Sequence, residues 1–537
     1  MQQQPIRINQ TGYSSRLPVH IAVLGEGALI IRDSGGIELF RQEVPAPSVD
    51  PSSGDPVSLV SPGMLPAGEY TAVFGPASRT FTVSDDVWDA VSGALIKGLY
   101  FQRCGCALLP EHAGPWTHAA CHTAPAADWE RPEQTRLLTG GWHDAGDYGK
   151  YVAPGAVTVA HLLYAWKLFP RGCSEALNIP ETGSGVPDIL SEARYELEWI
   201  LKMQRADGAF HHKLTKSHFA PFIMPENDTD PEYVMPVSGT ATGSACACLA
   251  LSARVWRGFD SGFAERMLRA AESAWSWLKA HPDNVPFRNP EGVRTGQYGD
   301  WSDLDERFWA ACELYAATGE AEYQADAETL YGRGIHPDQF GWADVGGLGA
   351  LCCLFDLGEE AGEVLYTKLR EDLVRAAEGA LALSGASGYG TSLPPQGYIW
   401  GSILPIMSHA MTMIAASLLT GREDMRDAAL LQWDYALGLN ALDISFVTGF
   451  GVRSVRNPHH RPSGADDVED PVPGLISGGP NKNHTYPATR EKLGEDLPPA
   501  RYFLDITPSA DTNEIAIYWN SPAIFVSAYL RTLARPE

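Results

Sequence analysis

Helical periodicity over most of the chain is the feature that most restricts the fold. From about residue 86 onward, apolar residues recur at i, i+3, i+4 and i+7, which places them on one face of a helix; Val186, Ile189, Leu190 and Ala193 begin one such face. The predicted helices span 86–102, 155–169, 187–203, 239–257, 264–281, 305–318, 321–331, 346–357, 360–381, 400–420, 425–437 and 520–534. About twelve helices in succession suit an (α/α)6 barrel, although periodicity alone also allows an α-solenoid.

Long loops rich in Gly, Pro and Asp separate these helices. They span 104–153, 204–238, 282–304, 382–399 and 438–512. Loops of this length are uncommon inside a compact domain and tend to carry function. We therefore expect the functional residues in the loops and at their junctions with helices.

The first 85 residues follow a different pattern. Short β-rich runs at 6–9, 20–25, 28–32, 69–74 and 79–83 alternate with Gly- and Pro-containing turns. Regularly spaced short strands of this kind indicate a small all-β sandwich. No catalytic constellation occurs there, so we predict two domains: a β-sandwich at 1–85 that serves as a scaffold, and an all-α domain at 86–537.

The segment 140–152, GGWHDAGDYGKYV, carries the most chemistry. It holds Asp144 and Asp147 three residues apart, in a run with too many glycines for an ordinary helix. Crowded carboxylates repel each other, so a fold retains them where their charge is used or neutralised. Trp142, Tyr148 and Tyr151 around them suit a sugar-binding cleft. A bare Asp pair is nevertheless common in solvated turns, so the assignment needs the rest of the sequence.

Charge and cysteine usage exclude several classes of protein. Lys plus Arg total 40 and Asp plus Glu 66, a net charge of −26. This disfavours nucleic acid or an anionic membrane as a partner, since both bind basic surfaces.

There is no run of eighteen apolar residues and no basic, apolar leader at the N-terminus. Several of the nine cysteines lie in apolar helical runs, as in a reducing compartment. We expect a cytoplasmic protein, although the mature form of a secreted one would look the same.

Five segments in order resemble glycoside hydrolase family 9, the inverting cellulase-type β-glucanases. They are 140–152, SGVPDILSEAR at 184–194, DERFWAACELY at 305–315, NPHHR at 457–461 and NEIAIYWNSP at 513–522. The start of the chain, INQTGY at 8–13, resembles the immunoglobulin-like domain that precedes many barrels of this family. The resemblance implies an immunoglobulin-like sandwich followed by an (α/α)6 barrel. One position departs from the family: Ala510 stands where an aromatic residue is usual.

The resemblance also implies roles in an inverting hydrolysis, which needs a general acid and a base that activates water. Asp147 matches the base, Asp144 the residue that helps hold the water, and Glu514 the acid. Taken alone, Glu514 would be an ordinary helix N-terminal residue. His459 and Arg461 match sugar-binding donors, although a lone His-His-Arg is more often a surface patch. Aromatic side chains in the loops are further candidates for stacking on sugar rings, namely Tyr298, Trp301, Tyr398 and Trp400, of which some are expected to be core.

Two metal sites are expected. Cys104, Cys121, His122 and His143 form a set of thiolates and imidazoles typical of structural zinc, with irregular spacing and with Cys106 as a competing ligand. The family resemblance implies zinc at these four residues. It also implies calcium at Ser184, Gly185 and Asp188, since hard cations bind backbone and carboxylate oxygens. Asp188 equally fits the first turn of a helix.

We therefore expect an inverting β-1,4-glucan hydrolase acting on cello-oligosaccharides and soluble β-glucans, with a monomer favoured. An alternative with the same fold is an exo-acting β-glucosidase or exo-β-glucosaminidase. A different class, a non-catalytic sugar-binding or zinc-sensing protein, is disfavoured by the intact set of three carboxylates. The sequence does not distinguish endo from exo cleavage.

Overall fold

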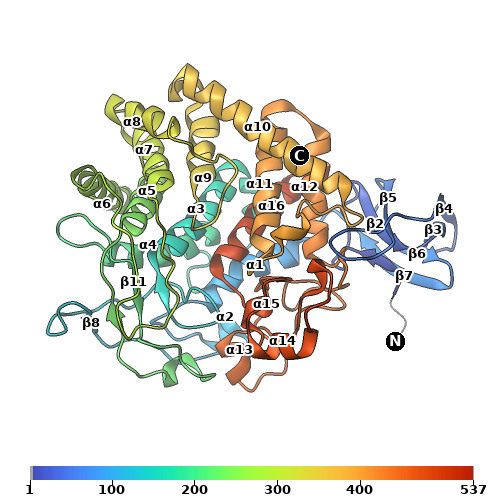
Figure 1. Ribbon diagram of the computed structural model, residues 1–537, viewed down its shortest axis with the longest axis horizontal. Helices are drawn as coiled ribbons and strands as arrows, with labels where there is room; N and C mark the ends of the chain where they lie inside the picture. The colour runs from blue at the N-terminus through green and yellow to red at the C-terminus, as the bar shows by residue number, and fades with distance from the viewer. Residues whose placement is uncertain (1–3, 536–537) are drawn as a thin grey trace.

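The computed structural model describes residues 4–535, which form a β-sandwich followed by a helical barrel (Figure 1). The sandwich has two antiparallel sheets, in the orders β1-β2-β5 and β4-β3-β6-β7. Its strands are β1 Ile6–Ile8, β2 Val19–Leu24, β3 Gly27–Asp33, β4 Glu38–Val44, β5 Val57–Gly63, β6 Gly68–Phe74 and β7 Ala77–Val83. The predicted strands match β1, β2, β3, β6 and β7, whereas β4 and β5 were missed. Inward-facing side chains of both sheets share one apolar core.

The barrel has an inner and an outer ring of helices. The inner ring is α3 Val152–Leu168, α5 Gly239–Trp256, α7 Leu304–Thr318, α9 Gly346–Leu351, α11 Ile403–Thr420 and α16 Ile517–Ala534. The outer ring is α1 Asp89–Phe101, α4 Asp188–Lys202, α6 Ser261–Ala280, α8 Ala321–Tyr331, α10 Glu363–Ala386 and α12 Glu423–Ala436. Neighbouring inner helices pack in series: α11 against α16, α16 against α3, α3 against α5, α5 against α7 and α7 against α9. The (α/α)6 barrel is therefore confirmed, and all twelve predicted helices are present.

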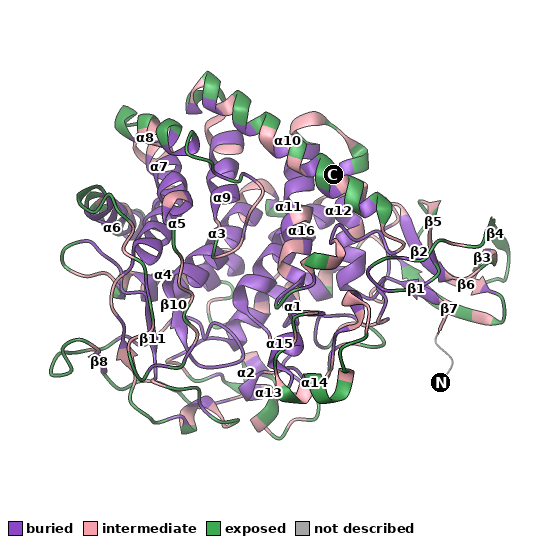
Figure 2. Cartoon of the chain, viewed as in Figure 1, coloured by how far each residue is buried: buried purple, intermediate pink, exposed green. Residues whose placement is uncertain are grey.

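Burial explains which helices form which ring. Helix α5 is rich in Ala, Gly and Ser and is buried on nearly all sides, whereas α6 is amphipathic and buries one face. Figure 2 shows the same division, with buried inner helices and exposed faces on the outer ones. Within residues 4–535, α11 alone is long and apolar enough to cross a membrane, but 67% of it is buried, and it packs against α10, α12 and α16. It therefore serves as a core helix of the barrel.

The loops of one barrel end form a second layer with short elements of its own. Five strands pair in the order β10-β11-β12-β8-β9. They are β8 Ala126–Asp128, β9 Thr135–Arg136, β10 Lys150–Tyr151, β11 Lys213–Thr215 and β12 Tyr233–Val234. The short helices α2 Pro110–Ala113, α13 Arg461–Ala465, α14 Pro487–Leu493 and α15 Ala510–Asn513 lie in the same loops (Figure 1). This layer carries the segments singled out from the sequence.

The sandwich packs against the barrel through buried polar contacts. Asp434 of α12 accepts a hydrogen bond from the Asn9 side chain and contacts the His20 ring, both at 2.8 Å. The Trp88 ring, just before α1, packs edge-on against Trp433. Strand β7 ends at Val83 and α1 begins at Asp89, on either side of the predicted domain junction at 85/86.

Candidate active site

Three loops from distant parts of the chain meet at the centre of the loop layer. Ala145 pairs with Ala516, and His459 pairs with Glu514, as isolated β-bridges. The Ile517 N–H donates to the Asp144 carbonyl at 2.8 Å. These backbone bonds fix three segments against one another: 140–152, here called the Asp-pair loop, 457–461, the His-Arg loop, and the start of α16.

Glycine makes this close approach possible. A Cβ atom on Gly146 would lie 1.9 Å from the His459 carbonyl oxygen, far inside van der Waals contact. The backbone N–H and the side-chain Nη1 of Arg461 both donate to the Gly146 carbonyl, at 3.0 and 2.8 Å. Arg461 thus holds the middle of the Asp-pair loop in place. A residue larger than glycine at position 146 would prevent this close approach.

The three loops line a cleft of about 670 Å³ that contains all three predicted catalytic carboxyls. Asp144, Asp147 and Glu514 all line it, together with His459 and Arg461. A cavity of this size suits a small ligand bound by a few polar groups among aromatic walls. The structure therefore brings together the five polar residues predicted from three separate segments of the sequence.

The two aspartates lie in different environments. Asp144 is 1% exposed, and the Tyr298 hydroxyl donates to its carboxylate. Burial raises the pKa of Asp144 well above its ordinary value, despite that hydrogen bond. Asp147 accepts a hydrogen bond from the Gly149 N–H at 3.0 Å. Burial also raises the pKa of Asp147, but the charge of Arg461 and this backbone donor oppose the rise. Asp147 therefore has more support for its ionised form.

Glu514 has the environment of a carboxylic acid that keeps its proton. Burial raises the pKa of Glu514 well above its ordinary value, and the negative charges of Asp147 and Asp144 add to the effect. The charge of Arg461 and a hydrogen bond from Trp400 oppose it only in part. Carboxyls that are pushed apart in pKa in this way are suited to separate acid and base roles.

His459 is held as a neutral ring. Its Nδ1 lies 2.6 Å from the Thr507 carbonyl, and burial lowers the pKa of His459 to about 4. The Arg461 Nε donates to the Ala220 carbonyl at 2.8 Å, which leaves the charge of the guanidinium facing the cleft. Both side chains are thus fixed by backbone acceptors. Because the neutral His459 uses its Nδ1–H for Thr507, its Nε2 is left as an acceptor for a sugar hydroxyl, whereas Arg461 is a donor.

The predicted aromatic residues divide into two groups. Tyr298 and Trp400 line the cleft, and Tyr298 adopts a positive φ of 47°. Trp301 is 73% exposed, lies outside the lining and packs against Arg288, so its substrate-binding role stays a prediction. Tyr398 is 1% exposed and belongs to the core. The sequence analysis did not single out several residues that also form the walls: Phe219, Gln297, Trp342, Tyr486 and Tyr518.

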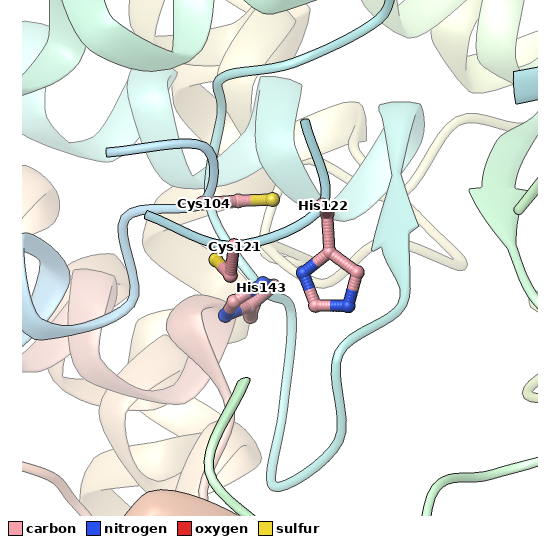
Figure 3. A group of neighbouring side chains, drawn as sticks. All are labelled: Cys104, Cys121, His122 and His143. Atoms are coloured by element: carbon pink, nitrogen blue, oxygen red, sulfur yellow. The ribbon is translucent and has the colours of Figure 1, made fainter. Parts of the chain in front are cut away.

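The predicted zinc residues form a compact group beside the Asp-pair loop (Figure 3). Ligand atoms of Cys104, Cys121, His122 and His143 lie within 4.8 Å of one another, and Cys106 is outside the group. The His122 Nδ1 and His143 Nε2 atoms are buried without an ordinary hydrogen-bond partner in the part of the chain that the structure describes. Orphaned imidazole nitrogens beside two thiols are the donor set that zinc takes in closed, four-coordinate sites. The residues therefore fit a structural zinc ion.

The residues predicted for calcium have a weaker arrangement. Asp188 begins α4, and its Oδ2 already accepts from the Leu177 N–H at 2.7 Å and the Thr182 hydroxyl at 2.6 Å. Ser184 and Gly185 lie exposed in the preceding turn. A carboxylate satisfied by protein donors gives no sign of a cation, so calcium at these three residues stays a prediction.

A different buried carboxyl, that of Glu306, lies beside another carboxyl. Glu306 is fully buried, and neither of its carboxyl oxygens accepts a hydrogen bond from the N–H group of another residue within 4–535, while Asp305 is its carboxyl neighbour. Burial and the neighbouring Asp305 and Asp300 raise the pKa of Glu306 well above its ordinary value. Buried carboxyls persist when they are protonated or when a cation neutralises them. From the sequence, this segment is predicted only as the start of a helix.

Comparison with known proteins identifies close relatives of the whole chain. Residues 88–527 match the model of glycosyl hydrolase family 9. A cellodextrinase from Butyrivibrio fibrisolvens is 36% identical over 541 residues, which cover 97% of this chain and 98% of that protein. A solved single mutant of a thermostable endoglucanase from Alicyclobacillus acidocaldarius is 34% identical and aligns with a TM-score of 0.92 over 98% of this chain and 100% of its own. A zinc-binding triple mutant of the family 9 endoglucanase J30 is 31% identical, with a TM-score of 0.90 over 98% and 99% of the two chains.

Proposed function

This chain belongs to glycosyl hydrolase family 9 and hydrolyses β-1,4-glucans, and we propose that Asp147, Asp144 and Glu514 carry out the reaction with inversion. The observation that supports this proposal most strongly is the difference between the surroundings of two carboxyls in one cleft. Burial raises the pKa of both, but Arg461 and a backbone N–H oppose the rise at Asp147, whereas the negative charges of Asp147 and Asp144 add to the rise at Glu514. Inversion requires one ionised base and one protonated acid.

In the proposed mechanism, Asp147 takes a proton from a water molecule on one face of the sugar. Asp144, held by the Tyr298 hydroxyl, accepts the other hydrogen bond of that water. Glu514 protonates the departing glycosidic oxygen on the opposite side. The oxygen of the water forms the new bond to the anomeric carbon as the glycosidic bond breaks. One proton has then moved to Asp147 and one has left Glu514, and exchange with solvent restores both.

We propose cello-oligosaccharides as the preferred substrates. The support is the name of the cellodextrinase that matches this chain over nearly its whole length. Aromatic walls from Trp400, Tyr486 and Phe219 suit the apolar faces of glucose rings.

Product analysis on cellotetraose, carboxymethylcellulose and chitosan oligomers tests the proposal. Rapid release of glucose and cellobiose from cellotetraose, with Asp147→Asn inactive, is the expected result. Faster hydrolysis of chitosan oligomers than of cellotetraose would overturn the substrate assignment. Unimpaired Asp147→Asn activity would overturn the assignment of the base.

We further propose that the metal bound by Cys104, Cys121, His122 and His143 is zinc. Such an ion adds folding free energy and fixes the residue next to Asp144, without an open position for substrate. The support is the donor chemistry of the four side chains and their spacing. Elemental analysis after purification without chelators tests it, with about one equivalent of zinc expected.

For a hard cation such as calcium, we propose the surroundings of Glu306 in preference to Asp188. The buried oxygens of Glu306 receive no N–H donor from another residue within 4–535 and lie beside the Asp305 carboxyl, whereas Asp188 is satisfied by two protein donors. Calcium prefers carboxylate and carbonyl oxygens. Loss of calcium-dependent thermal stabilisation in Glu306→Gln, but not in Asp188→Asn, is the expected outcome; the reverse pattern would restore the original prediction.

A further inference from the structure

A buried lysine lies behind the catalytic cleft, where the reaction described above does not use it. Lys213 is 0% exposed. Its Nζ donates three hydrogen bonds: to Asn289 Oδ1 at 2.7 Å, to Thr295 Oγ1 at 3.0 Å and to the Gly296 carbonyl at 2.6 Å. An ammonium group has three donors, so this set satisfies it fully. Burying a charge costs folding free energy unless the charge is hydrogen-bonded, and the complete set of partners around Lys213 indicates a specific role.

All three acceptors lie in the loop 289–296, which leads directly into the cleft. Gly296, Gln297 and Tyr298 line the cleft, and the Tyr298 hydroxyl donates to Asp144. The neighbouring His212 contacts the Gln297 carbonyl through Nε2 at 2.9 Å. Lys213 of β11 and His212 just before it therefore hold this loop at two points, and the loop in turn positions the donor to Asp144.

The strand pairing turns Lys213 toward the catalytic side. Lys213 of β11 pairs with Tyr151 of β10, and residues that are directly opposite in a sheet share a face. The Lys213 Nζ lies 5.5 Å from the centre of the Tyr151 ring, and that ring packs edge-on against Tyr298 at 4.6 Å. Gly296 packs closely against Tyr151, because a Cβ atom on Gly296 would lie 3.1 Å from the Tyr151 hydroxyl oxygen. Lys213 thus supports Tyr298 by two routes, one through the loop and one through Tyr151.

Lys213 also contributes charge to the base. Its positive charge lowers the pKa of Asp147, as that of Arg461 does more strongly. The other charged groups that face this carboxylate are Asp144 and Glu514, and both disfavour its ionised form. Burial lowers the pKa of Lys213 to about 7, so Lys213 carries its positive charge at acidic pH.

We propose that Lys213 is a positioning residue for the hydrolysis: it fixes the loop that carries Tyr298 and stabilises the ionised form of Asp147. The inference rests on the proposed role of Asp147 as the base. It assigns a function to a residue that does not line the cleft and that belongs to neither metal site. Lys213 acts through Tyr298 and through its electric field, without touching the substrate.

The test compares Lys213→Met with Lys213→Arg on cellotetraose across pH. Lys213→Met removes the charge and all three donors, so kcat should fall by about tenfold to a hundredfold, as for a misplaced catalytic group, while KM changes little. The acidic limb of the kcat profile should move to higher pH by about half a unit or more, because a positive charge near Asp147 is lost. Lys213→Arg keeps the charge, so its acidic limb should stay in place.

Two further variants separate this role from simple loss of stability. Lys150→Met removes a buried lysine from the opposite face of β10, where Nζ donates to the Leu138 and Gly140 carbonyls; it should lower the melting temperature without moving the acidic limb. Thr295→Val removes one acceptor and keeps the ammonium, so kcat should fall with the limb unchanged. This variant also provides the test if Lys213→Met does not fold.

An unshifted acidic limb in folded Lys213→Met, or a shift of the same size in Lys150→Met, would overturn the electrostatic role. Unchanged kcat in both Lys213→Met and Thr295→Val would overturn the positioning role. Failure of the underlying assignment is recognised separately: an active Asp147→Asn enzyme that keeps its acidic limb would show that the limb belongs to another group.

Discussion

Glu514→Gln is the substitution that tests the acid assignment most sharply. The amide is nearly isosteric with the carboxyl and keeps an oxygen for the hydrogen bond of Trp400. General-acid help is worth about 10²–10⁴ in rate, which corresponds to about 2.7–5.4 kcal/mol at 1.36 kcal/mol per tenfold. The full loss is expected on cellotetraose, because its leaving alkoxide needs the proton.

An aryl cellobioside with an acidic phenol provides the control, because its leaving group departs with little protonation. On this substrate the loss should stay below about tenfold. The alkaline limb offers a second readout. Glu514 works in its protonated form, and its pKa is raised, so activity of the natural enzyme falls as pH rises through that pKa. Glu514→Gln should lack this limb on the aryl substrate.

The pH dependence of stability gives an independent check on the direction of the Glu514 pKa shift. The folded pKa of Glu514 lies above the ordinary value of 4.5. Its contribution to stability is therefore greatest below the unfolded pKa and is lost as pH rises toward the folded pKa. The amide does not ionise, so Glu514→Gln should melt at the same or a higher temperature than the natural enzyme at neutral pH. Equal rate losses on both substrates, or a lower melting temperature at neutral pH, would refute the reasoning.

Three further substitutions test the surrounding structure. Cys121→Ser should lower both the zinc content and the melting temperature and reduce turnover, with little change in pH optimum; an unchanged melting temperature would count against the metal site. Gly146→Ala should destabilise the protein and reduce activity, because its Cβ would lie 1.9 Å from the His459 carbonyl oxygen. Gly379→Ala is the control: it lies on an exposed helix face with nothing within 4 Å of the added Cβ, so it should be tolerated or stabilising. Similar melting temperatures of the two variants would contradict the packing around Gly146. Tyr298→Phe removes the hydroxyl donor to the aspartate that holds the water and should reduce kcat by about tenfold; unchanged kcat would show that this hydrogen bond does not matter.

Much of the barrel is predictable because its signal is local and repeated. Helix α4 buries one face over four turns, so a few apolar residues at helical spacing suffice to predict it. Strands such as β8 and β12 have two or three residues and lie inside long loops. They are too short to show an alternating pattern, so the loop sheet that carries Lys213 could not be predicted. Strand β4 was missed because it is largely exposed and carries polar side chains at most positions.

The candidate site was predictable only where one segment carried several of its residues. Asp144 and Asp147 lie three residues apart in one segment, and the family resemblance assigned the acid role to Glu514. The walls come from single aromatic residues in separate loops, such as Phe219 and Trp342. Nothing in their local sequence distinguishes them from Trp301, which lies outside the cleft, because that difference depends on how the loops fold over the barrel end.

The stereochemical course of hydrolysis tests the central claim most directly. If Asp147 activates water and Glu514 protonates the leaving oxygen, their carboxyls should lie about 6.5–9.5 Å apart and the product should form with inversion. Proton NMR of cellotetraose during the first minutes of hydrolysis, before mutarotation, should then show the α-anomer of the new reducing end appearing first. Initial appearance of the β-anomer would mean retention, and it would contradict the assignment of Asp147 as a base.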